Sequence, residues 1–508
     1  MGHLSWAILI NLVKEVKMSK LGIQDVTVRD GNQSILATRM KREDILAIAA
    51  ALDKVGFYSL EVWGGATFDS AYRFLNQSAW ENLREINKAT PNTKLSMLLR
   101  GQNVVGYHHY DNDTLERFIR LTIENGIDIL RVFDALNDPD NLRNAFKFTK
   151  KHGGHLQAAI AYTVSPVHNN DYYIKLVKTY ESMGADSICI KDMSGIITPQ
   201  TAYELVSAIK QATDLPLNLH SHTTANATSL VMEQAMKAGV DVVDGCISPF
   251  SGGTAHLADE TLLEAAKLAG RKTALNMEAL DEAYELANSI VEKYIESGDL
   301  RVRSLIPNPK ILKYQVPGGM LSNLLSQLEQ QKQSHKLNDV LQEIPKVRKD
   351  MGYPPLVTPL SQMVGTQAVF NVLLGERYKI VPNEIKDYVQ GLYGQAPGEL
   401  NQDIVNHIRQ QSEKKEAVLP EDLPFLYEKN KKVMQEFLER EPEEEEVVAY
   451  TIFPEPVKNF YLNSIEVDSE DSEYKVESQA EQASFTSNNT KRTDPAEPIA
   501  FRMVLPTT

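Results

Sequence analysis

Two histidines separated by one residue are the clearest chemical signal in this chain. His220 and His222 lie at the end of the apolar segment 215–222, LPLNLHSH. In a β-strand, residues i and i+2 project from the same face, so both imidazoles would enter one site together. Neutral imidazole is a common ligand of divalent transition metals. The pair predicts a metal site, with two ordinary core or surface histidines as the alternative.

Two more residues of suitable type end other apolar segments. Asp30 closes segment 24–30, where its carboxylate would either coordinate the metal or serve as a turn or capping residue. Lys191 follows an apolar run and, if unmodified, would pair with Asp192 or extend toward solvent. Carbamylation would instead turn its amine into an anionic oxygen ligand. The resulting set of nitrogen and oxygen ligands would suit zinc, manganese or cobalt.

Three other segments carry groups that would act on a substrate. Arg100 follows an apolar run, where a guanidinium grips a small carboxylate in bidentate fashion or forms an ion pair with Asp134. The SGGT loop (251–254) would hold a hydroxyl near the same site, unless it is only a connecting loop. In WGGATFD (63–69), the glycine pair allows backbone to approach a substrate and leaves Asp69 above it.

All these residues lie at or near the ends of short apolar runs. The pattern is typical of strands buried on both faces of a parallel sheet, and amphipathic helical segments separate the runs. A strand followed by a helix, eight times over, predicts an α/β fold of the TIM (β/α)8 barrel type, with an open doubly wound sheet as the alternative. The expected strands are 24–30, 59–63, 94–100, 129–135, 155–163, 187–193, 215–222 and 242–247. Active residues of such barrels lie at the carboxyl ends of the strands, where these side chains fall.

The chain divides into four parts. Residues 21–275 form the expected barrel, and residues 276–440 form a mostly α-helical second domain with Pro/Gly breaks. Residues 441–508 begin with EPEEEE and predict an acidic, largely disordered tail. Residues 1–20 are an N-terminal extension, and we hypothesise that translation of the natural protein starts at Met18.

Composition limits the partners. The 508 residues carry a net charge of −15 with a pI near 5.3, which argues against nucleic acid as a partner. The two cysteines, Cys189 and Cys246, sit in apolar runs and are expected to be reduced core thiols of a cytoplasmic protein.

The motifs around these residues resemble the biotin-dependent carboxyltransferase family. That family includes the oxaloacetate decarboxylase α subunit, the carboxyltransferase domain of pyruvate carboxylase and the pyruvate-side subunit of methylmalonyl-CoA transcarboxylase. The resemblance covers roughly residues 21–440. Its motifs are RDGNQS (29–34), WGGATFD (63–69), LLRGQN (98–103), RVFDALND (131–138), IKDM (190–193), NLHSH (218–222), VPGGMLSNL (316–324) and PLVTPLSQMVGTQAVFNVL (355–373).

The resemblance implies roles for individual residues. The family's metal ligands match Asp30, carbamylated Lys191, His220 and His222. Its pyruvate-binding residues match Gln33 and Arg100, and residues that line its biotin pocket match Asp69 and Tyr107. Thr254 sits at the position of a threonine that shuttles a proton between biotin and the pyruvate methyl group. The catalytic residues are therefore expected to be Thr254, Lys191 and Arg100.

The sequence departs from the family pattern in three places. Gly31-Asn32 replaces an Ala-His-type pair, which should leave Asp30 and Gln33 usable. After Thr254 the chain reads AHLAD in place of a Ser-Gln-Pro run, so contacts to biotin beyond Thr254 are in question. No Ala-Met-Lys-Met biotin-attachment motif is found, so no biotinyl domain is expected and biotin would arrive on a separate carrier protein.

The sequence thus predicts the carboxyltransferase subunit of an oxaloacetate decarboxylase-type complex, a lyase in that role, working on oxaloacetate and pyruvate. Close alternatives are the transcarboxylase subunit and the corresponding subunit of a split pyruvate carboxylase. More distant alternatives are an acyl-CoA aldol or Claisen lyase and a scaffold protein without activity. A homodimer is the family expectation, and a membrane decarboxylase subunit is a candidate partner that would hold the chain at the membrane surface.

Overall fold

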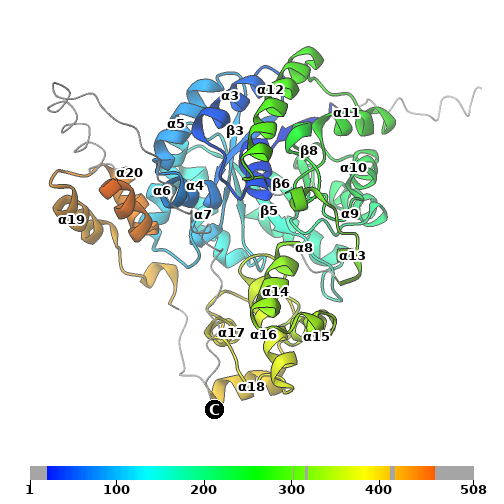
Figure 1. Cartoon of the computed structure of the whole chain (residues 1–508), viewed down its shortest axis with the longest axis vertical. Coiled ribbons are helices and arrows are strands. Elements are labelled where there is room, and N and C mark those ends of the chain that lie inside the picture. The colour runs from blue at the N-terminus through cyan, green and yellow to red at the C-terminus, as the bar shows by residue number, and fades with distance from the viewer. Residues whose placement is uncertain (1–19, 301, 315–317, 412–417, 464–508) are drawn as a thin grey trace, which may run out of the picture.

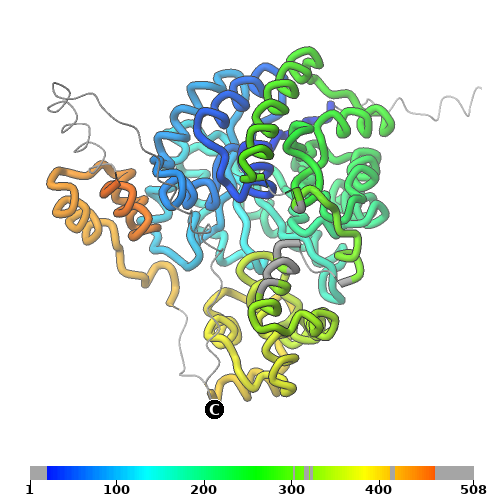
Figure 2. The backbone as a smooth tube through the Cα atoms, in the orientation of Figure 1, coloured from blue at the N-terminus to red at the C-terminus, as the bar shows by residue number. Residues whose placement is uncertain are grey.

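The computed structural model describes residues 20–463 apart from residues 301, 315–317 and 412–417 (Figures 1 and 2). The proposed start at Met18 and residues 464–508 of the expected tail (441–508) lie outside the described residues. Among the described residues, no helix is long and apolar enough to cross a membrane.

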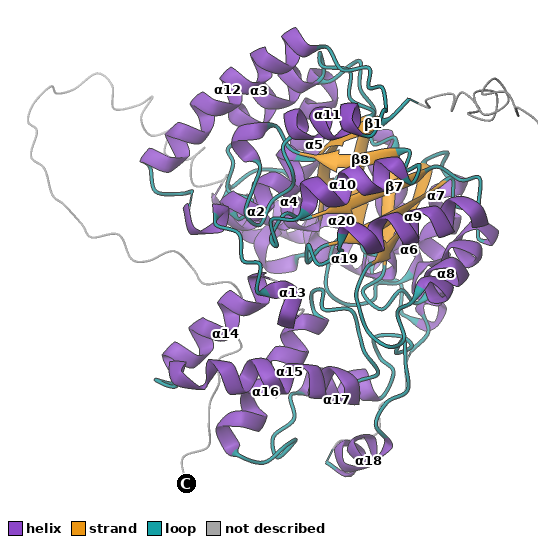
Figure 3. Cartoon of the chain, turned by 90° about the vertical axis from the view of Figure 1, so that its right-hand side faces the viewer, coloured by secondary structure: helices purple, strands orange, loops and turns teal. Residues whose placement is uncertain are grey.

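Eight parallel strands close into a barrel in chain order, and β8 pairs with β1 to complete it. The predicted barrel is confirmed, and the open sheet is excluded. Figure 3 shows the strands at the centre of this part of the molecule, surrounded by helices. The strands are β1 (Gly22–Asp25), β2 (Ser59–Gly64), β3 (Leu95–Leu99), β4 (Ile129–Phe133), β5 (His155–Ala161), β6 (Ser187–Asp192), β7 (Leu217–Ser221) and β8 (Val242–Gly245).

The helices between the strands form the outer layer, and polar caps fix where many of them begin. The Asp138 side chain, for example, accepts from the backbone N–H of Asp140, and Pro139 occupies the first turn of α7. These helices are α2 (Asn32–Leu36), α3 (Arg42–Leu52), α4 (Gly65–Phe74), α5 (Ala79–Ala89), α6 (Asn112–Glu124), α7 (Pro139–Lys151), α8 (Asn170–Ser182), α9 (Pro199–Ala212), α10 (Thr228–Lys237), α11 (Asp259–Leu268) and α12 (Met277–Glu296).

The first strand is shorter than the sequence predicts. β1 ends at Asp25, whose carboxylate accepts from the Thr27 backbone N–H at 2.9 Å and from the Thr27 hydroxyl at 2.6 Å. These bonds turn the chain out of the strand, and Thr27–Gly31 forms a single π-helical turn. Such turns are rare and often mark functional sites. Asp30 therefore lies on a buried turn above β1 and not on the strand itself.

A separate group of helices packs against the loops that follow β4 and β5. Leu136 belongs to its apolar core, and Arg348 donates to the Val164 carbonyl at 2.9 Å and to the Thr163 hydroxyl at 2.7 Å. Figure 1 shows these helices below the barrel. They are α14 (Gly318–Gln330), α15 (Leu337–Asp350), α16 (Leu360–Leu374), α17 (Asn383–Val389) and α18 (Gln402–Gln410). The short helix α13 (Ile311–Tyr314) precedes them in the chain, and Ile311 belongs to the barrel core.

The chain then returns to the side of the barrel through α19 (Tyr427–Leu438) and α20 (Glu444–Ile452). The acidic run 441–446, expected to lie in a solvated tail, opens α20 and docks on α6. Glu444 pairs with Arg117 and with Arg120, each at 2.6 Å. Behind these ion pairs, Phe453 is buried in the same apolar core as the barrel. The acidic run is docked and not solvated because arginines of α6 neutralise its charge. The local sequence does not reveal these distant arginines.

Candidate metal centre and active site

Four buried side chains converge at the carboxyl ends of the barrel strands. They are Asp30, His220, His222 and His256, and one ligand atom from each lies within 4.8 Å of the others. Asp30 comes from the turn after β1, the first two histidines from the end of β7, and His256 from the loop between β8 and α11. The Nε2 atoms of the three histidines lie 3.4, 3.6 and 3.3 Å from Asp30 Oδ2, in chain order.

The nearest polar neighbour of the other ring nitrogen of each histidine is a group that accepts a hydrogen bond, although His220 Nδ1 also lies 3.3 Å from the Arg131 guanidinium. His220 Nδ1 lies 2.7 Å from the Asp244 carboxylate, and His222 Nδ1 lies 2.7 Å from the Thr254 carbonyl. His256 Nδ1 lies 3.2 Å from the Ser221 carbonyl. Each Nδ1 must therefore carry a proton, which leaves the three Nε2 atoms as bare lone pairs in neutral rings.

Lys191 reaches the same cluster from β6. Its side chain is 1% exposed, and its Nζ lies 2.7 Å from His220 Nε2 and 3.8 Å from Asp30 Oδ2. Burial lowers the pKa of Lys191 to about 8, although the nearby Asp30 opposes this shift. A larger share of this amine than of an ordinary lysine is therefore unprotonated at neutral pH.

Asp30 is held as an anion. Burial alone would raise its pKa, but Arg29 and His222 lower the pKa well below the ordinary value. Arg29 donates to Asp30 Oδ2 at 2.9 Å and is itself fixed by Glu61 on β2. Burial also lowers the pKa of His220 well below its ordinary value, so this imidazole stays neutral.

A fully buried ion pair supports His220 from inside the barrel. Asp244 on β8, which accepts from His220, also accepts from Arg131 on β4 at 2.5 Å. Arg131 in turn reaches Gln157 and Glu61. A carboxylate behind a ligating histidine fixes its tautomer and ring orientation, an arrangement that recurs at protein metal sites.

These donors fit a divalent transition metal. Three unprotonated imidazole nitrogens and one carboxylate oxygen point at one another across distances that leave room for a cation between them. Within the described residues, the buried His256 Nε2 makes no hydrogen bond, as expected of an atom placed to bind a metal.

Arg100 lies at the rim of this site after β3. Its guanidinium donates to the carbonyl groups of Val105 and Gly106 and stacks 4.8 Å above the ring of Tyr107. A Cβ at Gly65 would come within 3.0 Å of the guanidinium carbon, so the second glycine of WGGATFD makes room for Arg100. The alternative ion pair with Asp134 does not form between these two described residues, because Asp134 accepts from Leu136 and Asn141 instead.

The remaining predicted residues surround the cluster at different depths. Gln33 is exposed, and its Oε1 accepts from Arg29 at 3.2 Å. Asp69 is partly buried and pairs with Arg73 one turn along α4. The Thr254 hydroxyl donates to the Ser34 carbonyl at 3.0 Å, while its own carbonyl accepts from His222. The structure thus links Thr254 to a metal-site histidine through its backbone.

The sequence did not single out His256. It lies in AHLAD, the segment noted only as a departure from the family pattern. Its position two residues after Thr254, in the loop that follows the last strand, is the signal that could have revealed it. The His220–Asp244 and Arg29–Glu61 contacts were missed too, because each joins residues of two different segments, which no local pattern relates.

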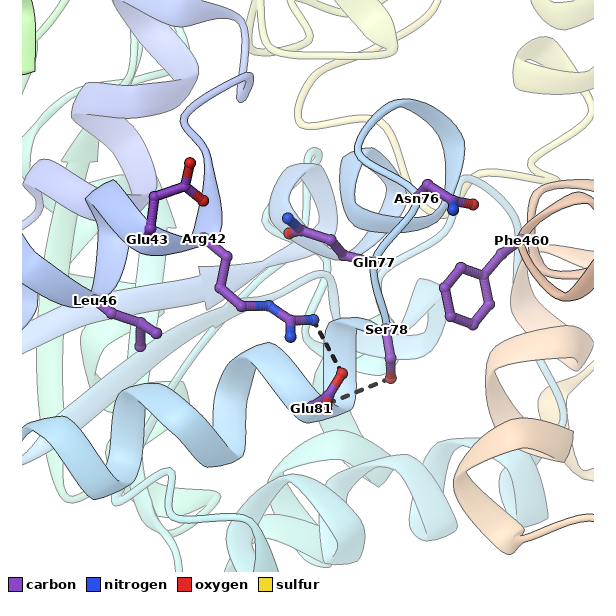
Figure 4. A pocket seen from close by; sticks show the side chains of 8 residues that line it. All are labelled: Arg42, Glu43, Leu46, Asn76, Gln77, Ser78, Glu81 and Phe460. Carbon is purple, nitrogen blue, oxygen red and sulfur yellow. Dashed lines mark hydrogen bonds and ion pairs between the residues drawn. The ribbon is translucent and has the colours of Figure 1, made fainter. Parts of the chain in front are cut away.

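A shallow pocket elsewhere on the molecule has no part in this site. Figure 4 shows it on the outer side of the barrel, between α3, the start of α5 and Phe460. The Arg42–Glu81 ion pair crosses it at 3.0 Å. Its walls come from the starts of two outer helices and from Phe460, and none of the residues that line it belongs to the cluster.

Comparisons with known proteins agree on the class. Residues 311–495 match the family model described as a conserved carboxylase domain, and residues 138–287 match the HMGL-like model. The chain is 48% identical to a pyruvate carboxylase subunit of Methanocaldococcus jannaschii, over 88% of this chain and 78% of the relative. It is 41% identical to the methylmalonyl-CoA carboxyltransferase 5S subunit of Propionibacterium freudenreichii subsp. shermanii, over 93% of this chain and 95% of the relative.

The solved structures show the same arrangement. The carboxyl transferase domain of Rhizobium etli pyruvate carboxylase, with pyruvate and biocytin, superposes with a TM-score of 0.80 at 31% identity, covering 88% of this chain and 78% of that one. This chain shares the barrel and the helical domain with that structure, and it has a buried polar cluster at the carboxyl ends of the strands. Together with the sequence relatives, these features define a carboxyl-transferring enzyme. The chain belongs to the biotin-dependent carboxyltransferase family.

Proposed function

We propose that this enzyme moves a carboxyl group between oxaloacetate or pyruvate and biotin attached to a separate carrier protein. The observation that carries the proposal is the buried cluster of Asp30, His220, His222 and Lys191 at the mouth of a family barrel, with Arg100 at its rim. In the decarboxylating direction, the C3–C4 bond of oxaloacetate breaks and a carbon–nitrogen bond forms on the biotin ureido group. The proton released from that nitrogen ends on the methyl carbon of pyruvate.

The proposed metal ligands are Asp30, Lys191, His220 and His222, and the metal is zinc, manganese or cobalt. A bound divalent metal would polarise the keto group and stabilise the enolate charge that develops when the C3–C4 bond breaks. Arg100 would bind the keto-acid carboxylate beside Gln33 and hold it in line for transfer.

Lys191 would act in its carbamylated form. Carbamylation needs an unprotonated amine, and burial lowers the Lys191 pKa toward that state. The modification changes the side-chain charge from +1 to −1, and a divalent metal adds +2. The net charge of the buried cluster therefore stays constant when both arrive together, which avoids an uncompensated buried charge.

Thr254 would relay the proton between biotin nitrogen and the pyruvate methyl carbon. Its hydroxyl has both a donor and acceptor function, and it lies in the loop that also carries His256. Here the hydroxyl donates to the Ser34 carbonyl, so the relay requires rotation of this side chain toward the substrates. Asp69 and Tyr107 would line the biotin side of the site.

For the physiological assembly, we propose an oxaloacetate decarboxylase-type complex in which the barrel at residues 21–275 and the helical domain at 276–440 serve the transfer step. In this complex the chain forms a homodimer and receives biotin on a separate biotinyl carrier protein. A membrane decarboxylase subunit is a candidate further partner. The relatives support other assemblies, because one is named as a subunit of pyruvate carboxylase and another as the 5S subunit of a transcarboxylase. All three assemblies use the same half-reaction.

Isotope exchange tests the half-reaction. Purified protein is incubated with [3-13C]pyruvate, unlabelled oxaloacetate and free biotin, and label in oxaloacetate is followed by NMR. We expect biotin-dependent transfer of label into oxaloacetate, which spontaneous decarboxylation cannot produce. A relative is named 2-oxoglutarate carboxylase large subunit, so the specificity control is labelled 2-oxoglutarate with unlabelled oxalosuccinate, its carboxylated form, as the carboxyl donor. Exchange with 2-oxoglutarate and not with pyruvate would contradict the proposed substrate.

A further inference from the structure

His256 has no part in the ligand set that the sequence predicts, yet its environment is that of a ligand. The side chain is 0% exposed, and its Nε2 makes no hydrogen bond within the described part of the chain. A buried polar atom left without a partner loses its hydration with no compensating hydrogen bond, which destabilises the fold. Asp30 Oδ2 lies 3.3 Å from this nitrogen.

The ring is held in the orientation that a metal would require. His256 Nδ1 donates to the Ser221 carbonyl, so Nε2 carries the lone pair in the neutral ring. The ring centroid lies 4.4 Å from that of His220 and 4.2 Å from that of His222. The three imidazoles therefore pack together, with their Nε2 atoms facing one carboxylate oxygen.

An ion pair between His256 and Asp30 explains this arrangement poorly. It would require a buried imidazolium beside Lys191 and Arg29, and Asp30 Oδ2 already accepts from Arg29 at 2.9 Å. His220 and His222 face the same oxygen with equivalent lone pairs. A single divalent cation among these atoms would satisfy all three nitrogens at once, without adding protons to a crowded cationic site.

We propose that His256 Nε2 is a further ligand of the metal, a third imidazole beside His220 and His222. The inference rests on the proposed function only in that it requires the metal. It raises the number of protein ligands to five, three nitrogens and two oxygens, when Lys191 is carbamylated. It also favours zinc or cobalt over manganese, since imidazole suits the former and carboxylate-rich sites suit the latter.

X-ray absorption at the zinc edge of the wild-type protein counts the imidazoles directly. We expect multiple scattering from three imidazole rings in the wild type and from two in His256→Gln. Two rings in the wild type, unchanged in the variant, would overturn the proposal. The wild-type count decides the question even if the variant folds poorly.

Metal affinity, measured by competition with a chelator, gives an independent result. Removing a residue that only supports a ligand costs 10–100-fold in affinity, so removing a ligand should cost at least about 100-fold. His256→Gln should therefore weaken zinc binding as much as His222→Gln does. His168→Gln is the matched control, because His168 is also buried with an unbonded Nε2 but lies apart from the cluster.

Neither measurement uses substrate, so the outcomes separate the two proposals. Three imidazoles and tight zinc binding, without carboxyl exchange, would support His256 and contradict the proposed function. Carboxyl exchange together with wild-type affinity in His256→Gln would support the function and overturn the ligand role.

Discussion

At the residue scale, the ability of the cluster to bind a metal depends on which nitrogen of each histidine carries the proton. Each histidine of the cluster gives its Nδ1 proton to a fixed acceptor, so each Nε2 keeps its lone pair, and Lys191 Nζ must move away from His220 Nε2 before a metal binds there. Two of these acceptors are backbone carbonyls, which would remain if another residue replaced Ser221 or Thr254. The third is Asp244, whose position depends on the buried Arg131. The orientation of the three imidazoles therefore depends on the backbone at Ser221 and Thr254 as well as on side chains.

Lys191→Arg tests the carbamate. Arginine keeps the positive charge but cannot form the anionic ligand, and its guanidinium would stay beside His220 and repel a cation. We expect loss of bound metal and loss of carboxyl exchange, measured by elemental analysis and by the NMR assay. Lys178→Arg, on the exposed face of α8, should change neither. A fully active, metal-loaded Lys191→Arg protein would contradict the ligand assignment.

Thr254→Ala separates proton transfer from metal binding. The backbone carbonyl that accepts from His222 remains in the variant, so the metal content should be unchanged. Loss of the hydroxyl should slow carboxyl exchange by about 10²–10⁴-fold, the usual contribution of a positioned proton-transfer group. Thr254→Ser should restore much of the rate. Loss of metal in Thr254→Ala would show that the residue has a structural role instead.

The sequence predicted the parts of the site that lie on single strands. His220 and His222 could be paired because a strand has a period of two, and both lie in the observed cluster. The sequence could not pair Arg29 with Glu61, or His220 with Asp244, because those contacts depend on how neighbouring strands lie against each other in the folded barrel. His256 was missed because a loop has no periodicity from which to predict where its side chains point.

At the scale of elements, the turn after β1 determines where Asp30 lies. Asp25 ends the strand by bonding Thr27, and its carboxylate also accepts from the Ile247 backbone after β8. The short apolar run predicted a strand through residue 30, because such a run does not reveal that a buried side chain will bond the backbone two residues later and end the strand. The other seven strands lie within the ranges that their apolar runs predicted, apart from Gly64 at the end of β2.

A pair of buried carboxyl groups at this turn should make stability depend on pH. Burial raises the pKa of Asp25 to about 6, and burial beside Asp25 raises the pKa of Asp259 well above its ordinary value. The folded pair retains a proton that the unfolded chain releases near pH 4. The folded state is therefore favoured at low pH and loses about 1.4 kcal/mol per pH unit between the unfolded and folded pKa values.

Asp259→Asn supplies a permanent donor to Asp25 and removes this dependence. The variant should gain stability over the wild type as the pH rises from 4 to 8, measured as the denaturation midpoint at each pH. Asp214→Asn, in an exposed loop, controls for the loss of a charge. An Asp259→Asn protein whose stability relative to wild type does not rise with pH would contradict the shared proton.

At the scale of the whole molecule, the segment after the helical domain packs on the outer surface of the barrel. The Trp80 indole donates to the Glu445 carbonyl at 3.1 Å, and the Tyr110 hydroxyl donates to the Ile452 carbonyl at 3.0 Å. α20 therefore covers barrel residues that would otherwise be exposed. Composition indicated a solvated acidic linker here, because the arginines that neutralise it lie more than 300 residues earlier in the chain.

Phe453→Ala tests whether this segment is integral to the barrel. Phe453 is 6% exposed, and its ring lies 6.0 Å from that of Phe68. Removing a buried phenylalanine usually costs about 3–5 kcal/mol, so the melting temperature should fall by at least about 5 °C. Leu462→Ala, at a position 47% exposed, should change it little. Equal melting temperatures for both variants would show that the segment is only loosely attached.

The activity proposed for this chain is the transfer half-reaction at a metal site. The most direct measurement is pyruvate release from oxaloacetate by the purified protein, with and without free biotin, before and after removal of the metal. We predict release that biotin stimulates, that chelation abolishes and that zinc, cobalt or manganese restores. Metal-loaded protein that releases no pyruvate from oxaloacetate, with or without biotin, would contradict the account and favour an acyl-CoA lyase.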